Sequence, residues 1–239
     1  MQWLLSFAFT ALLFVDTFLW AVAVLLTGPF GLDALHAVAR AWARFHLWLL
    51  RVMCGLDYVV EGAGNIPREG AHISYWKHSS TWETLAQMLI LPPQAWVLKR
   101  EIMWIPLIGW ATALLKPIAI NRSAGHRAVN QVVEQGRRRL AEGLWVLIFP
   151  EGTRVAPGQT RKYGVSGALL ASQTGAMLVP IAHNAGDFWP RRGLLKKRGT
   201  IRVVIGPPIV SAGRDPRELN AEAQGWIEGT MREISAAYR

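Results

Sequence analysis

From residue 57 onward, short runs of β-branched and apolar residues alternate with longer helical patterns. The runs short enough for strands lie at 57–61, 71–75, 95–99, 117–121, 145–149, 177–183 and 201–205. The intervening helical patterns lie at 80–91, 101–115, 123–142 and 164–175, with a last one near 214–238. This alternation predicts an α/β fold with a largely parallel central sheet flanked by helices.

An apolar N-terminal stretch precedes the alternation. Residues 3–26 carry one charged side chain, Asp16. As an α-helix the stretch would be about 36 Å long, which is enough to cross a bilayer. Gly28 and Pro29 then favour a break in the helix. A cleaved signal peptide fits poorly, because a basic leading region and a small-residue cleavage site are both missing.

A second helical pattern follows at residues 33–54. Its arginines are spaced so that they share one face of a helix: Arg40, Arg44 and Arg51. An apolar side combined with a cationic stripe is typical of a helix that lies in the lipid headgroup layer. We therefore predict that residues 1–55 form a membrane-anchoring hydrophobic helical hairpin, monotopic or with one span, ahead of an α/β domain over 56–239. A hairpin packed only on the core of that domain is the alternative.

The composition restricts the partners. Lys and Arg number 26 against 16 Asp and Glu, a net charge of +10, which favours a phosphorylated substrate or an anionic membrane surface. Twelve tryptophans favour the membrane–water interface. No zinc spacing or RNA-binding aromatic motif is present, so nucleic acid is not expected. Cys54 is the only cysteine, which excludes an internal disulfide and suits a reducing cytoplasm.

The segment YWKHSSTWETL, residues 75–85, contains the first candidate site residues. Its Ser80-x-x-Glu83 pattern matches a capping box, in which the glutamate accepts the backbone N–H of the serine that caps the helix. His78 then lies in the preceding loop, and a glutamate that folds back points toward it. A carboxylate on one imidazole nitrogen stabilises the imidazolium that forms when the other nitrogen takes a proton. We predict that Glu83 both caps the helix and supports His78 as a general base.

Two further polar signals follow predicted strands. FPEGTR at 149–154 follows the strand at 145–149, and Arg122 follows the strand at 117–121. Each also has an ordinary interpretation, as a turn or as a surface arginine. Since ligands bind where the carboxyl ends of parallel strands share an edge, we expect both signals and His78 to meet at one cleft. An arginine and a threonine in a tight loop are suited to binding phosphate or a hydroxyl group.

Taken together, these motifs resemble the glycerolipid acyltransferase family. The resemblance rests on the H-x4-acid motif, an arginine about forty residues later, FPEGTR, and the proline-containing strand LVPIAHN, and it covers residues 57–210. It identifies residues 56–239 as an acyltransferase domain. The sequence departs from the family pattern where Glu83 replaces the commoner aspartate, where Asn121 stands in place of an acid, and where Val155 replaces a serine.

The resemblance implies roles for the site residues. His78 is implied to be the general base and Glu83 its acidic partner. The residues implied to hold the glycerol phosphate are Arg122, Glu151, Gly152, Thr153 and Arg154. No metal and no bound cofactor are implied. Backbone N–H groups at the start of the 80–91 helix are candidates for stabilising the oxyanion of the tetrahedral intermediate.

The implied reaction is transfer of a fatty acyl group from acyl-CoA or acyl carrier protein to the sn-2 hydroxyl of lysophosphatidate, giving phosphatidate. The apolar segment 100–115 is then a candidate for receiving the acyl chain or entering lipid, with a core helix as the alternative. A basic chain on such an anchor belongs at the cytoplasmic face of the inner membrane. Other acceptors stay open: glycerol 3-phosphate, another lysophospholipid or a lipid-linked amine. A non-catalytic membrane-bound lipid-binding protein is the alternative from a different class.

Overall fold

The computed structural model describes residues 1–238, with the backbone alone for Arg122. Within this described part, a seven-stranded sheet has the order β1-β7-β6-β2-β5-β3-β4. The strands are β1 Leu56–Glu61, β2 Ile73–Trp76, β3 Gln94–Lys99, β4 Ile118–Ile120, β5 Trp145–Ile148, β6 Leu178–His183 and β7 Gly199–Ile205. Neighbouring strands are parallel except for β6 and β7. The prediction of an α/β fold with a largely parallel sheet is confirmed.

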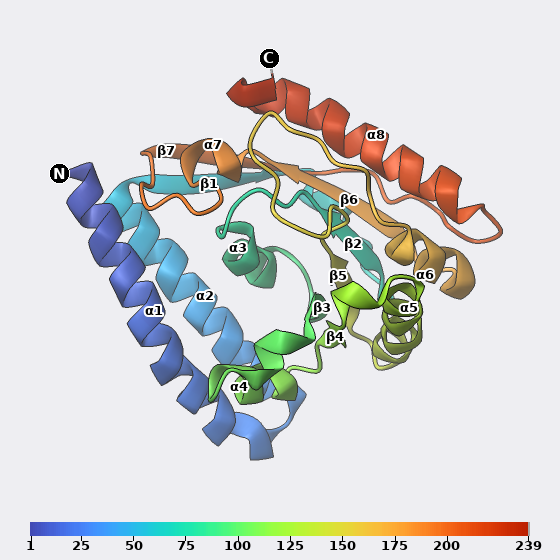
Figure 1. Ribbon diagram of the computed structural model, residues 1–239, viewed down its shortest axis with the longest axis horizontal. Helices are drawn as coiled ribbons and strands as arrows, with labels where there is room; N and C mark the ends of the chain where they lie inside the picture. The colour runs from blue at the N-terminus through green and yellow to red at the C-terminus, as the bar shows by residue number, and fades with distance from the viewer. Residues whose placement is uncertain (239) are drawn as a thin grey trace.

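Helices cover both faces of the sheet (Figure 1). On one face lie α1 Gln2–Thr27, α2 Leu32–Cys54, α3 Glu83–Ile90 and α4 Ile108–Leu114. On the other face lie α5 His126–Ala141, α6 Ser166–Thr174 and α8 Pro216–Ile234. The short helix α7, Ala185–Phe188, follows β6, and the 3-10 turns are η1 Gly28–Phe30, η2 Ala63–Asn65, η3 Arg100–Trp104, η4 Arg122–Ala124 and η5 Ala236–Tyr238.

The central strands are buried on both faces because successive side chains point to opposite sides of a strand. In β5, Trp145 and Leu147 pack into the hydrophobic cluster beneath α1–α4. Val146 and Ile148 alternate with them and pack into the cluster beneath α5, α6 and α8. The continuous apolar run that predicted this strand therefore reflects a sheet covered on both sides.

The N-terminal helices form a hairpin that packs along the domain. The buried side of α1 includes Phe9, Leu13 and Val24, which belong to the same hydrophobic cluster as the sheet. Asp16, the charged residue of this helix, lies with Oδ2 3.3 Å from Nε2 of His46 on α2. The hairpin thus contacts the core and also carries an apolar outer face. The division into units 1–55 and 56–239 stays a prediction.

The predicted helix at 101–115 is wrong in one respect, because the segment is broken into η3 and α4. Pro106 lies at the break, and a proline supplies no backbone N–H and disfavours helical geometry in the residue before it. Ile105 is accordingly extended, and Leu107 has a positive φ of 62°. The result is a bent, tryptophan-bearing segment beside α1 (Figure 1).

Candidate active site

Parallel strand ends bring three polar segments together. β5, β2 and β6 are neighbours, so the segment after β2 that carries His78 lies beside the 149–154 loop after β5 and beside His183 at the end of β6. β4 lies at the sheet edge, separated from β2 by β5 and β3, which is roughly 14 Å at the usual strand spacing. Arg122 begins η4 after β4, and its side chain lies outside the described residues.

The side chain of Glu83 folds back over the start of α3. Its Oε1 accepts the backbone N–H groups of Ser79 and Ser80 at 3.1 and 2.9 Å, and lies 2.9 Å from Nδ1 of His78. The carboxylate is fully buried, and the imidazole is 11% exposed. One oxygen therefore joins the start of the helix to the histidine, which is the geometry expected from the sequence.

The helix start itself differs from the predicted capping box. α3 begins at Glu83 with Trp82 in the cap position, so Ser80 is not its N-cap. Ser80 instead forms an isolated bridge with Pro190, which holds its backbone in an extended conformation. Its Oγ accepts the N–H of Trp82 at 3.1 Å. The serine hydroxyl thus stabilises the turn before the helix, while Glu83 keeps its bond to the Ser80 backbone.

The surroundings set the charges of the pair. Burial raises the pKa of Glu83, but the hydrogen bonds from His78 and from the Ser80 backbone outweigh burial and bring this pKa below its usual value. Because an ionised carboxylate can only accept, Nδ1 of His78 donates to it, and Nε2 is the ring nitrogen left to take up a proton. The ring stacks on Phe149, with centroids 3.9 Å apart and planes at 18°. This arrangement suits proton uptake at Nε2.

A second histidine, which the sequence analysis did not single out, lies beside the pair. His183 is fully buried, donates from Nε2 to the Lys77 carbonyl at 2.7 Å, and lies 3.9 Å from Oε2 of Glu83. Burial lowers its pKa, so the ring is neutral. Its place at a strand end was the signal that could have revealed it. Within the described residues, no group of three or more His, Cys, Asp or Glu side chains forms a metal-ion site.

The 149–154 loop encloses the backbone of His78. Oε1 of Glu151 accepts the His78 N–H at 3.2 Å, and the Val155 N–H donates to the His78 carbonyl at 2.7 Å. Gly152 has a φ of 69° and closes a turn by donating its N–H to the Phe149 carbonyl at 3.0 Å. A positive φ of this kind favours glycine. Both polar backbone groups of the candidate base are therefore fixed by the loop.

Glu151, which the resemblance implies to hold glycerol phosphate, is buried against a lysine. Its side chain is fully buried and faces Lys77, with 3.5 Å between Oε1 and Nζ. A carboxylate would also repel a phosphate, so this position does not support a role in holding glycerol phosphate. Thr153 and Arg154 are half-buried, and Arg191 donates to the Arg154 carbonyl at 2.9 Å. Thr153 and Arg154 are the side chains of this loop that remain candidates for ligand contact.

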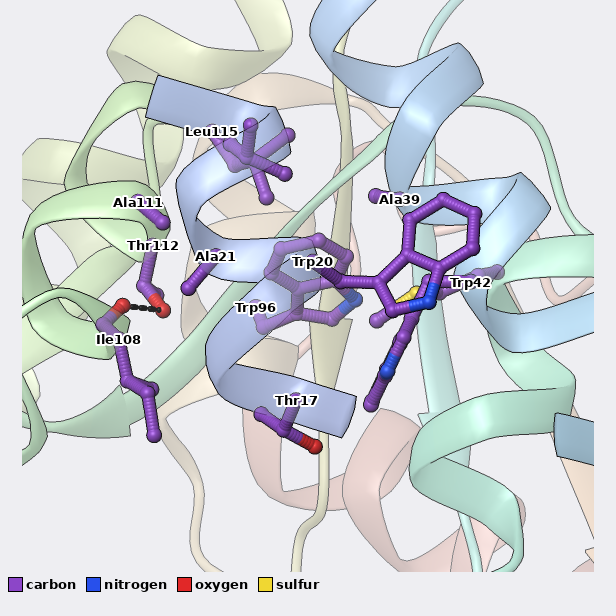
Figure 2. Close-up of a pocket in the computed structure, with 12 residues that line it drawn as sticks. Thr17, Trp20, Ala21, Ala39, Trp42, Trp96, Ile108, Ala111, Thr112 and Leu115 are labelled. Carbon is purple, nitrogen blue, oxygen red and sulfur yellow. Dashed lines mark hydrogen bonds between the residues drawn. The ribbon is translucent and has the colours of Figure 1, made fainter. Parts of the chain in front are cut away.

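An apolar cavity of about 200 Å³ opens between the hairpin and the α3–α4 segment. Figure 2 shows Trp20 from α1, Trp42 from α2 and Ala111 from α4 around it. Met88, on α3, also lines it. Since Glu83 begins the same helix, Met88 lies five residues further on, about 7.5 Å along the helix axis. The cavity and the His78–Glu83 pair are therefore joined by one short helix.

The buried Glu151 predicts a pH dependence of stability. Burial raises its pKa to about 7, against the attraction of Lys77, from an ordinary value of 4.5. Between these values the folded protein holds a proton that the unfolded chain has released, so stability is highest at the acid end and is lost as pH rises to about 7. We expect Glu151→Gln to remove this loss, which is on the order of 1–3 kcal/mol between pH 5 and 7. Urea unfolding in detergent at several pH values measures the free energy of unfolding of both proteins. The same decrease of this free energy with pH in the parent protein and in Glu151→Gln would contradict the prediction.

Comparisons with known proteins give the family. The sequence pattern of the family described as Acyltransferase matches residues 57–184. The 1-acyl-sn-glycerol-3-phosphate acyltransferase of Pseudomonas aeruginosa is 49% identical over 201 residues, covering 83% of this chain and 78% of the relative. The 1-acyl-sn-glycerol-3-phosphate acyltransferase alpha of Homo sapiens is 28% identical, covering 75% and 64%. A crystal structure of the acyltransferase for 1-acyl-sn-glycerophosphate from Thermotoga maritima has the same fold, with a TM-score of 0.81, 21% identity and coverage of 97% and 95%. The chain belongs to the acyltransferase family.

Proposed function

We propose that the protein transfers a fatty acyl group from an acyl thioester to the sn-2 hydroxyl of lysophosphatidate, forming phosphatidate. The observation that carries the proposal is the buried Glu83 carboxylate on Nδ1 of His78, beside the 149–154 loop. The choice of acceptor follows the name of the 49% identical relative. The donor is acyl-CoA or acyl carrier protein, and no metal or bound cofactor takes part.

In this reaction His78 acts as the general base. Nε2 takes the proton of the sn-2 hydroxyl while the hydroxyl oxygen attacks the carbonyl carbon of the thioester. The tetrahedral intermediate then collapses as the C–S bond breaks, and the proton passes from Nε2 to the leaving thiolate. Glu83 stabilises the imidazolium between these two steps. General base catalysis of this kind contributes about 10²–10⁴-fold.

The backbone N–H groups at the start of α3, which are candidates for stabilising the oxyanion, already have acceptors. The Ser79 and Ser80 N–H groups already donate to Glu83, and the Trp82 N–H donates to Ser80 Oγ. Two of these donors hold the carboxylate and the third holds the serine hydroxyl, so all three are engaged, and this argues against their use in stabilising the intermediate. The role of the Ser79 and Ser80 N–H groups in the proposal is to keep Glu83 ionised and aimed at His78.

The phosphate of the acceptor is proposed to contact the arginines that follow β5 and β4. Thr153 and Arg154 lie in the loop that encloses His78, and both side chains are half-buried. Arg122 is kept from the set that the family resemblance implies, and Gly152, whose N–H donates to the Phe149 carbonyl, shapes the turn that carries Thr153 and Arg154. Arg191, which donates to the Arg154 carbonyl, adds a further positive charge beside the loop. Glu151 is left out of this set because it faces inward.

The apolar cavity is proposed to take the fatty acyl chain. Its walls come from α1, α2, α3, α4 and β3, and they include Trp20, Trp42 and Trp96 (Figure 2). An acyl chain is favoured in such a space because burial removes its methylene groups from water. α3 would hold the reacting carbonyl near His78 at its start and the chain against Met88 further along. The segment 100–115 thus contributes to the chain pocket through α4.

The protein is membrane-associated, and α1 with its extension to Phe30 is long and apolar enough to cross a bilayer. We propose instead that α1 lies in the interface. Gln2 at its start donates to the carbonyls of Cys54 and Lys196 at 2.9 and 2.6 Å, and its far end packs beside α4. A helix held at both ends cannot leave the domain without breaking these contacts. The basic chain then faces an anionic leaflet, at the cytoplasmic side of the inner membrane.

The outer faces of η3 and α4 are proposed to enter lipid beside α1. Trp104 is 66% exposed and Trp110 is 56% exposed, and Arg100 stacks over the Trp104 ring at 5.8 Å. We expect the double variant Trp104→Ser/Trp110→Ser to bind vesicles of anionic phospholipid about tenfold more weakly, because indole rings favour the interface. Liposome flotation measures this. Val210→Ser, at an exposed apolar position outside the hairpin and α4, is the control, and equal binding by both variants would rule out the proposed contact.

The proposed function is tested by acyl transfer with a panel of acceptors. The purified protein is incubated in detergent with acyl-CoA or acyl carrier protein thioesters, and thiol release is followed with each acceptor. The acceptors are lysophosphatidate, glycerol 3-phosphate, a second lysophospholipid and an amine-linked lysolipid. We expect transfer to lysophosphatidate and none to glycerol 3-phosphate, with His78→Ala inactive. Transfer to another acceptor alone would make that acceptor the substrate in place of lysophosphatidate. No transfer to any acceptor would overturn the proposal.

The role of Glu83 is tested by Glu83→Gln. A glutamine oxygen can still accept the Ser79 and Ser80 N–H groups, so we expect the melting temperature to stay close to that of the parent protein. The neutral amide stabilises imidazolium poorly, so we expect kcat to fall by about 10²–10⁴-fold. Steady-state kinetics and thermal unfolding measure the two effects. Full activity in this variant would show that Glu83 only holds the helix start.

A further inference from the structure

A buried charge cluster lies beneath the candidate base. Nζ of Lys77 is 2.6 Å from Oε1 of Glu228 and 3.5 Å from Oε1 of Glu151, and the lysine side chain is fully buried. Tyr163 donates its hydroxyl to the same Glu228 oxygen at 3.0 Å. Burial by itself would lower the pKa of Lys77, but the two carboxylates raise it above its usual value, so the ammonium is charged. One cation is thus shared between two buried acids.

The cluster is bonded directly to the backbone of His78. Lys77 precedes His78, and its carbonyl accepts Nε2–H of His183 at 2.7 Å. The Glu151 oxygen that faces the lysine is the oxygen that accepts the His78 N–H. The ammonium therefore determines where Glu151 lies, and Glu151 in turn fixes the N–H of the base. Any shift of Lys77 would move the residue that carries the reacting imidazole.

Glu228 reaches this cluster from the C-terminal helix α8. The helix is tied to neighbouring loops by the Asn184 amide, which donates to the Ile234 carbonyl at 2.8 Å, and by Ser235, which donates to Asp187 at 2.8 Å. Buried ion pairs are weak evidence for stability, because desolvation of the charges offsets their attraction. Oε2 of Glu228 and Oε2 of Glu151 have no hydrogen-bond partner among the described residues. Such a cluster is therefore poorly explained by stability alone.

We infer that Glu228 is a positioning residue for the His78 base, acting through Lys77 and Glu151. The inference rests on the proposed function of His78. The inference gives α8 a role in catalysis. Sequence spacing does not reveal this role, because Glu228 and Lys77 are 151 residues apart. The substrate is not expected to touch Glu228, which is buried.

The first test compares two substitutions on the same helix. Glu228→Gln keeps an acceptor for Lys77 but removes its counter-charge, and Glu222→Gln, at an exposed pair with Arg214, is the control. We expect Glu228→Gln to lower kcat by about tenfold or more with KM for both substrates within about twofold, because the loss falls on the chemical step. Glu228→Asp, which keeps the charge, should regain part of kcat. Parent-level kcat in Glu228→Gln would overturn the inference.

A double variant separates positioning from stability. In Lys77→Met/Glu228→Met both partners of the ion pair are replaced, and such replacements commonly preserve stability. We expect the melting temperature to return toward that of the parent protein while kcat stays low, because nothing then orients Glu151. Recovery of kcat together with the melting temperature would assign Glu228 a structural role and overturn the inference.

Hydrogen–deuterium exchange of the peptide over residues 77–83 tests the link without any substrate. The His78 N–H donates to Glu151, so we expect it to exchange faster in Glu228→Gln and at the parent rate in Glu222→Gln. Unchanged exchange in Glu228→Gln would overturn the link. If the parent protein transfers no acyl group to any acceptor, the proposed function fails, and the exchange result still decides whether Glu228 positions His78.

Discussion

Oε1 of Glu83 is the atom on which the site depends. It accepts two backbone N–H groups and lies against the imidazole of His78, inside a fully buried carboxylate. Burying a charge costs free energy that hydrogen bonds must offset, and all the hydrogen bonds of this carboxylate within the described residues are made by Oε1, since Oε2 has no partner there. These three donors keep the group ionised, and in doing so they bind the turn after β2, the start of α3 and the base into one rigid unit. The chemistry of the histidine follows from this arrangement.

The His78–Glu83 unit lies between two different layers, one on each face of the sheet. On one face, α1–α4 form an apolar layer (Figure 1). This layer contains the cavity and is bordered by the exposed Trp104 of η3 and Trp110 of α4. On the other face, α8 contributes Glu228 to the charges beneath His78. The base thus lies between a lipid-facing layer and a polar support. A parallel sheet makes this possible, because β2, β5 and β6 end side by side at one edge.

Much of the fold could be predicted from local patterns. The strands were found because each buried strand is a short apolar run, and a run of this kind is visible without knowledge of its partners. The helix at 101–115 was predicted as one piece, and the break at Pro106 was overlooked although proline carries that signal. His78 and Glu83 were found because they are five residues apart, a separation within which one loop and one helical turn set the geometry.

Contacts between residues that are far apart in the sequence could not be predicted. Glu151 and Glu228 lie 73 and 151 residues from their partners at His78 and Lys77. No periodicity or motif spacing connects such positions, and the resemblance gave Glu151 a ligand-binding role that its burial does not support. The sequence by itself determined the strand–helix order, the apolar hairpin and the His78–Glu83 pair, since these depend on local spacing. Only the tertiary structure decided which charges meet beneath the base, because strand order and helix packing bring them together.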